Sequence, residues 1–238
     1  TTAAINAVVD IAEIAAADAQ DSDAGVDTIT GNTGDDVILG GLAGDVINGN
    51  ASHDVIVGDN GVITIFSNDT TVATYGSIAT QDVALGADDT IYGNAGNDVI
   101  FGGLADDIID AGHGNNIVFG DNGFIDWTAA DVSRSYTSTL PGDDTDPSDI
   151  DRISTIDAAV GGIDKITSGT GNDIILAGAF GDVVEAGTGS NLVIGDSGQI
   201  IAAESNTSRF VGHSITLGLV ETIAYGVGGS DMITTGMG

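Results

Sequence analysis

The sequence predicts an all-β fold: a right-handed parallel β-roll, or β-solenoid, of nonapeptide repeats with non-repeat inserts between blocks of repeats. Three observations lead to this prediction. Between Gly31 and Gly61 an isoleucine recurs at every ninth residue, as Ile38, Ile47 and Ile56, an aspartate stands two residues before each one, and glycine-rich stretches separate them. Three residues of strand followed by six of turn make half of a flattened coil, so two nonapeptides complete one turn of a solenoid.

The pattern divides the chain into blocks and inserts. A lead-in segment, residues 1–25, precedes three blocks, and a fourth block begins at residue 230 and is cut off at residue 238, so we expect the natural protein to be longer. The blocks are residues 26–65, 88–127 and 163–201, and the inserts are residues 66–87, 128–162 and 202–229. The ninth-residue positions expected to point into the coil are Ile29, Ile38, Ile47, Ile56, Ile65, Ile91, Ile100, Ile109, Val118, Trp127, Ile166, Ile175, Val184 and Val193.

Charge excludes several classes of partner. The chain has 36 acidic and 4 basic residues, a net charge of -32 at pH 7, yet 42% of its residues are hydrophobic, which is too many for an acidic disordered tail. Acidity of this size repels nucleic acid and anionic membranes, and it opposes a compact state through self-repulsion. We therefore expect a folded chain that binds cations and no nucleic acid.

Motifs for other kinds of site are missing from the sequence. Cysteine is absent, so no disulfide or thiolate site holds the fold, and no apolar run approaches the roughly 18 residues of a membrane span. The three histidines are His53, His113 and His213. Ser52, His53 and Asp54 are neighbours whose side chains cannot converge as a catalytic triad does. We expect His53 and His113 to be exposed turn residues and the chain not to be an enzyme.

The nonads share a consensus across the blocks. They include GNTGDDVIL, GGLAGDVIN, GNAGNDVIF, GGLADDIID and SGTGNDIIL. This consensus resembles the RTX family, the hemolysin-type calcium-binding repeat GGxGxDxUx, in which U is a large apolar residue. The resemblance implies bound calcium ions and export by a dedicated secretion route, so we expect an extracellular protein, either secreted or at the cell surface.

The chemistry of calcium assigns a role to the repeated aspartates. Calcium takes six to eight oxygen ligands, and a glycine-rich turn with one aspartate offers both carbonyl and carboxylate oxygens. Turns two nonads apart stack on one edge of the coil, so we expect pairs to share an ion: Asp27 with Asp45, Asp36 with Asp54, Asp89 with Asp107, and Asp164 with Asp182. On the other edge the pairs are Asp98 with Asn116 and Asp173 with Asn191, where the amide weakens the site, and Asp231 opens the fourth block.

In this register three aspartates serve two stacked sites each: Asp45, Asp107 and Asp182. Three sites per block would hold about nine calcium ions and bring the net charge to about -14. Metal binding and folding are therefore expected to form one equilibrium.

Each block closes on a GDNG or GDSG motif, at Gly58, Gly120 and Gly195. The usual aspartate position is apolar there, so the carboxylate moves forward and is expected to complete a last site with an aspartate of the same block. The expected pairs are Asp59 with Asp45, Asp121 with Asp107, and Asp196 with Asp182. The alternative is an Asx turn that directs the chain into the insert.

Outward positions of alternate strands form an apolar stripe. Its twelve residues are Val37, Leu39, Val55, Val57, Val99, Phe101, Ile117, Phe119, Ile174, Leu176, Leu192 and Ile194. An exposed stripe of this length would be a sticky patch. We expect the inserts to cover it, through residues such as Ile153, Ile156, Leu217 and Val220; otherwise it is a surface for self-association.

These features predict a calcium-binding structural region of a secreted or cell-surface protein that folds on binding calcium into a rigid stalk, fibre or layer component. Two alternatives stay open. One is an adhesive or ligand-binding module, and the other is the calcium-binding carrier domain of a secreted enzyme, whose catalytic domain would lie outside this sequence.

Overall fold

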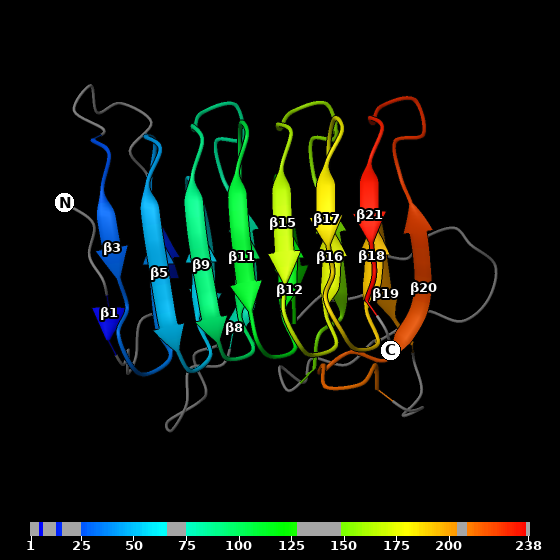
Figure 1. Cartoon of the computed structure of the whole chain (residues 1–238), viewed down its shortest axis with the longest axis horizontal. Coiled ribbons are helices and arrows are strands. Elements are labelled where there is room, and N and C mark those ends of the chain that lie inside the picture. Colours follow the sequence, from blue (N-terminus) through cyan, green and yellow to red (C-terminus); the bar gives the residue numbers. More distant parts are fainter. Residues whose placement is uncertain are drawn as a thin grey trace.

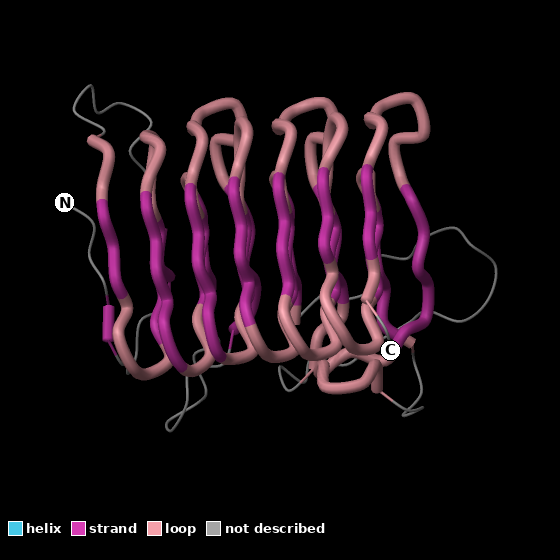
Figure 2. The backbone as a smooth tube through the Cα atoms, viewed as in Figure 1, coloured by secondary structure: helices cyan, strands magenta, loops and turns pink. Residues whose placement is uncertain are grey.

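A computed structural model describes residues 5–6, 13–15, 25–65, 75–127, 149–203 and 209–236, which contain strands and no helix. The expected lead-in segment and the inserts thus lie partly outside the described residues. The strands form three sheets of seven strands each, and the coils follow one another along the long axis (Figures 1 and 2). The predicted all-β parallel roll is confirmed, and a third sheet is added to it.

The outer parallel sheet faces the viewer in Figure 1. Its strands pair in parallel and in register, so that equivalent residues of successive coils lie side by side. From the N-terminal end they are β3 (Thr28–Thr30), β5 (Val46–Ala51), β9 (Thr90–Ala95), β11 (Ile108–Gly112), β15 (Lys165–Ser168), β17 (Val183–Glu185) and β21 (Met232–Thr234).

The inner parallel sheet lies behind it and takes the other strand of each coil. Its strands are parallel except for β1, which pairs antiparallel with β4. They are β1 (Ile5–Asn6), β4 (Asp36–Leu39), β6 (Val55–Val57), β10 (Val99–Phe101), β12 (Ile117–Phe119), β16 (Ile174–Leu176) and β18 (Leu192–Ile194).

The third sheet is antiparallel throughout. It combines the end of each block with the insert that follows, and its hairpins are joined edge to edge. Its strands are β2 (Glu13–Ala15), β7 (Gly61–Ile65), β8 (Tyr75–Thr80), β13 (Gly123–Asp126), β14 (Arg152–Thr155), β19 (Gly198–Ala202) and β20 (Leu217–Thr222).

A first core fills the space between the two parallel sheets. One residue per strand points inward because alternate residues of a strand face opposite sides. Eleven of the predicted inward residues are buried there, with Val193 partly buried beside them. The eleven are Ile29, Ile38, Ile47, Ile56, Ile91, Ile100, Ile109, Val118, Ile166, Ile175 and Val184.

The predicted inward positions at the block ends are wrong. After each GDNG or GDSG motif the chain leaves the coil and enters the antiparallel sheet, so Ile65 pairs with Tyr75 of β8. Trp127 packs in a second core, against Tyr75 at 5.6 Å between ring centroids. The nine-residue period continues in the sequence past the point where the strand changes sheets.

The second core lies between the inner parallel sheet and the antiparallel sheet. Ten residues of the apolar stripe are buried in it, and Val99 and Leu192 pack against it. Phe101 and Phe119 stack within it at 4.4 Å between centroids, and Ile153 of the second insert is fully buried opposite them. The expected cover by the inserts is confirmed. The stripe is therefore no surface for self-association, although Val220 of the third insert stays exposed.

Candidate calcium sites

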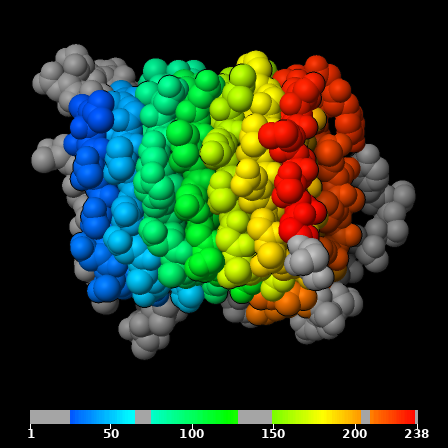
Figure 3. Space-filling view, viewed as in Figure 1, coloured from blue at the N-terminus to red at the C-terminus, as the bar shows by residue number. Residues whose placement is uncertain are grey.

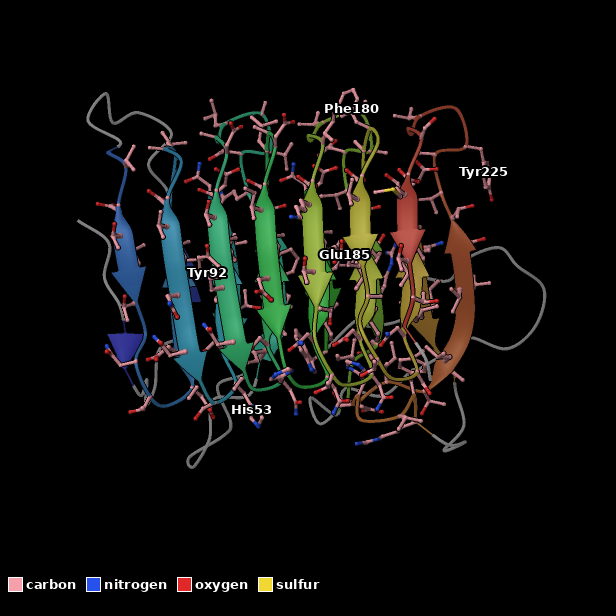
Figure 4. All side chains as sticks on the ribbon, in the orientation of Figure 1. His53, Tyr92, Phe180, Glu185 and Tyr225 are labelled. Carbon is pink, nitrogen blue, oxygen red and sulfur yellow. The ribbon has the colours of Figure 1, made fainter. Side chains whose placement is uncertain are left out.

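The turns between the two parallel sheets gather on two edges of the roll. Phe180 marks the upper edge and His53 marks the lower edge in Figure 4, while Tyr92 and Glu185 project from the outer sheet between them. Each turn ends in the aspartate or asparagine that precedes a strand, so equivalent side chains of successive coils stack along each edge.

On the upper edge the backbone N–H of each ladder residue donates to Oδ1 of the next, at 2.6–3.1 Å. This upper ladder runs through Asp27, Asp45, Asp89, Asp107, Asp164, Asp182 and Asp231. On the lower edge every such bond is 2.9 Å, and the lower ladder runs through Asp36, Asp54, Asp98, Asn116, Asp173 and Asn191. All six pairs predicted from the sequence are adjacent in these ladders.

The ladders also continue across the inserts, which the sequence analysis missed. Asp45 bonds to Asp89 over 44 positions, and Asp107 bonds to Asp164 over 57 positions. On the lower edge Asp54 reaches Asp98 over the first insert in the same way. Each insert returns the chain to the same edge of the roll. The aspartate that recurs at the start of each block is the sequence signal for this continuation of the ladder.

After the first residue of each ladder, the Oδ1 atom of every aspartate accepts a backbone N–H, whereas the Oδ2 atom does not. Among the described residues, eight buried ladder carboxylates have an Oδ2 atom with no hydrogen-bond partner: Asp36, Asp45, Asp54, Asp89, Asp98, Asp107, Asp164 and Asp182. Leaving one buried polar atom without a partner costs about 1–3 kcal/mol, and more for a charged group. A cation bound beside this row would give these oxygen atoms the partner that they lack.

Glycine opens the space beside these oxygens. A Cβ placed on Gly40 would lie 2.0 Å from the carbonyl oxygen of Gly58 and 2.7 Å from Asp45 Oδ2. A Cβ on Gly58 itself would lie 2.1 Å from Asp89 Oδ2. The volume that a side chain would fill is thus bounded by a carbonyl oxygen and a free carboxylate oxygen. These are the hard donors that calcium prefers, so the residues fit the ion.

The family of the chain follows from its repeats. The family model of the RTX calcium-binding nonapeptide repeat matches residues 21–56, 83–109, 92–124, 159–179 and 176–199, which together make up half of the chain. The chain belongs to the RTX family. Searches of curated proteins and of solved structures returned no significant match. RTX repeats bind calcium and are typical of secreted proteins, so this chain is a calcium-binding repeat region.

Carbonyl oxygens lie beside the free carboxylate oxygens in these RTX turns. Within the described residues no three acidic or histidine side chains come together in a way that suits a metal ion. Carboxylate and carbonyl oxygens together satisfy calcium, which tolerates irregular geometry. In the same residues no helix is long and apolar enough to cross a membrane.

Burial and mutual repulsion act on the RTX carboxylates when no cation is near. Burial raises the pKa of Asp89 to about 7 and, together with the charge of Asp164, raises the pKa of Asp107 to about 11. Burial and the charge of Asp121 raise the pKa of Asp164 to about 9. Calcium offsets both effects, because it supplies positive charge where water has been removed.

The GDNG aspartates differ from the ladder residues. Asp59 accepts backbone N–H bonds at both oxygens, from Ala87 at 3.1 Å and Leu104 at 2.6 Å. Asp121 likewise accepts N–H bonds from Gly162 and Ala179, and Asp196 accepts one from Gly229 at 2.9 Å. Each carboxylate therefore joins its own block to the returning end of the following insert.

The sharing of a calcium ion with Asp45, Asp107 and Asp182 stays a prediction, and Asp196 lies within electrostatic reach of Asp182. The carboxylate charge of Asp121 acts on Asp164 of the following block, and Asp182 acts on Asp121 in turn. Asp59 lies within electrostatic reach of both Asp45 and Asp89. The backbone N–H bonds span 28 to 58 positions, so they are not the local Asx turn of the alternative.

The ring nitrogens of His53 and His213 form hydrogen bonds with backbone groups of other turns. His53 is exposed, and its Nδ1 accepts the N–H of Asn97 at 2.7 Å. His113 is also exposed, as expected, and its Nδ1 lies 3.2 Å from Thr170 Oγ1. His213 is buried, and its Nε2 bonds to the carbonyl oxygen of Asn172.

Proposed function

We propose that this RTX chain is a non-enzymatic, calcium-dependent structural segment of an extracellular protein, and that it serves as a rigid stalk, fibre or layer component. One observation carries the proposal: eight buried carboxylate oxygens stand without a partner along both edges of a continuous roll. Such a row of unpartnered oxygens destabilises a metal-free fold. It is expected in a fold whose ordered state requires bound cations.

Charge supports coupling of folding to calcium. A net charge of -32 opposes compaction, and only 4 basic residues are available to offset it. Binding of calcium to the folded state alone stabilises that state by mass action. Calcium sites of extracellular modules commonly bind with dissociation constants of about 10⁻⁴–10⁻³ M. The chain would then remain unfolded at cytosolic calcium levels and fold after export.

The layered architecture supports a mechanical role. Each coil contributes a strand to both parallel sheets, and every block end continues into the antiparallel sheet. Bending the rod would stretch ladder hydrogen bonds at both edges and separate side chains in two cores. Interactions between neighbouring repeats of this kind give repeat proteins their continuous, extended shape.

Titration of the calcium-free chain with calcium tests the proposal. We expect circular dichroism to show a cooperative gain of β-structure, with calorimetry reporting several bound ions. Magnesium is the matched control and should fail, because it demands a tight octahedral shell and loses water reluctantly. A circular dichroism spectrum of β-structure that does not change on adding chelator would contradict the proposal.

A second function is favoured by the outer face of the outer parallel sheet, shown in Figure 3. Ile108 is 50% exposed and Met232 is 61% exposed, and the sheet register places both in one row with Val46. Thr90 and Lys165 stand in the same row, and exposed apolar side chains between such polar ones would suit an adhesive module. Adhesion of the calcium-loaded chain to apolar-coated beads should then fall in Ile108→Asp; equal adhesion would exclude this role.

A further inference from the structure

The lower edge changes character along its length. In its N-terminal half the residue five positions before each ladder aspartate is a glycine: Gly31, Gly49 and Gly93. A Cβ on any of them would lie within 2.4–2.7 Å of the free Oδ2 of Asp36, Asp54 or Asp98. In the C-terminal half the equivalent residues are Ala111, Ser168 and Ala186, so side chains occupy the space that glycine leaves open.

The ladder side chains of this second half already have partners. Ser168 Oγ donates to Oδ2 of Asp173, the one buried aspartate of this half, so that oxygen is not free. Asn116 Nδ2 donates to the carbonyl oxygen of Gly114 at 3.4 Å, and Asn191 Nδ2 donates to that of Ala186 at 2.5 Å. Amide and hydroxyl donors thus take the acceptor positions that a cation would need.

A ladder position that binds calcium is distinguished from one that does not by an unpartnered Oδ2 atom, and less well by the glycine five residues earlier. On the upper edge Ala177 stands where the other turns have glycine, yet Oδ2 of Asp182 beside it has no partner. Only in the second half of the lower edge do an occupied space and a satisfied side chain occur together.

The third insert covers this same half. His213 Nε2 bonds to the carbonyl oxygen of Asn172, and its ring stacks on Phe210 at 5.6 Å between centroids. A Cβ on Gly212 would lie 2.5 Å from Asn115 Cγ, so the loop backbone rests directly on the turns of the lower edge. The turns under this loop are joined to each other by asparagine side chains: Asn115 Oδ1 accepts the N–H of Asn172 at 2.8 Å.

We propose that the lower edge is divided into a calcium-binding half at Asp36, Asp54 and Asp98, and a calcium-independent seam from Asn116 to Asn191 on which the third insert docks. The inference rests on the proposed calcium-dependent function and adds where that dependence ends. The upper edge binds calcium along its length. In the folded chain the seam is held by the hydrogen bonds of Asn116, Asp173 and Asn191, and it binds no calcium of its own.

Two isosteric substitutions test the division. Asp98→Asn and Asp173→Asn both keep an Oδ1 acceptor for the ladder, so each leaves the backbone bonds intact. We expect equilibrium dialysis against calcium to show the loss of a bound ion in Asp98→Asn and an unchanged stoichiometry in Asp173→Asn. Loss of an equal amount in both variants would overturn the division.

A gain of binding provides a second test if Asp98→Asn fails to fold. Ala111→Gly with Asn116→Asp recreates the glycine and the free carboxylate in the seam and should add bound calcium. An unchanged stoichiometry in this folded double variant would contradict the inference. Asp107→Asn on the upper edge is the control for the proposed function: if it loses no calcium, the ladders do not bind the ion at all, whatever holds for the seam.

Discussion

The backbone N–H of Asp107 donates a 2.9 Å hydrogen bond to Oδ1 of Asp164, a residue 57 positions further along the chain. Within a block, Asp89 donates to Asp107 Oδ1 at 2.7 Å in the same way. The insert between Asp107 and Asp164 therefore does not interrupt the ladder. Both ladder neighbours of Asp107 are carboxylates, and burial with the charge of Asp164 raises its pKa to about 11, so a cation is needed here to keep it charged.

Asp107→Asn should change stability in opposite directions with and without calcium. Burial and the charge of Asp164 hold the pKa of Asp107 near 11, so the calcium-free fold must protonate it, and asparagine removes that requirement. We expect the variant to be about 1–3 kcal/mol more stable in chelator and less stable in calcium. Thermal unfolding in calcium and the fraction of β-structure in chelator, both followed by circular dichroism, measure this. Asp110→Asn, on the exposed face of the outer sheet, should shift either value by less than about 0.5 kcal/mol.

Acidity should stabilise the calcium-free chain. Burial raises the pKa of Asp54 and Asp89 from 3.8 to about 7, and that of Asp59 and Asp121 to about 8. The folded state then binds protons more tightly than the unfolded state, so this stability is fully present below about pH 4 and is lost as the pH rises through 7 to 8. Circular dichroism of the calcium-free chain at pH 5 and pH 8 measures it as the fraction of β-structure, which should be larger at pH 5. Greater stability at pH 8 would contradict the assignment.

Phe101→Asp should destabilise the fold without changing its association state. The ring is fully buried between the inner parallel sheet and the antiparallel sheet and stacks on Phe119. Loss of a buried phenylalanine costs about 3–5 kcal/mol, and the new carboxylate adds a desolvation cost. Tyr92→Asp, on the outer face, is the matched control and should have little effect. Light scattering that showed bundles of wild type dissolving in Phe101→Asp would mean that the stripe is an assembly surface after all.

Asp59→Ala should weaken the connection between the first two blocks. It leaves the half-buried N–H groups of Ala87 and Leu104 without their acceptor, at up to about 1–3 kcal/mol for each group. Asp196→Ala should cost less, because Asp196 accepts a single exposed N–H bond, from Gly229. Hydrogen exchange at residues 86–104 would report the loosened contact. Equal, small effects of both substitutions would show that the block-end carboxylates do not hold the inserts.

The residues of the first core and the ladder partners within each block could be predicted from the sequence. A nine-residue period is local: once Ile38 points inward, strand alternation turns Val37 and Leu39 outward, and Asp36 must precede the strand at the turn. Repetition of that unit then stacks like residues, which is why the pairs Asp36 with Asp54 and Asp89 with Asp107 follow from the sequence alone.

Only the tertiary structure decided what happens at the block ends. Ile125 occupies the aspartate position of the repeat, yet it is buried in the second core, because its strand pairs antiparallel with β8 and β14 of two different inserts. Those inserts share no repeat, so no local pattern predicts which strands pair. The sequence by itself determined the roll and its acidic edges through short-range periodicity. The third sheet, the ladder bonds that cross the inserts, and the satisfied state of Asp173 depend on contacts between residues far apart in the chain, which form only when the coils have stacked.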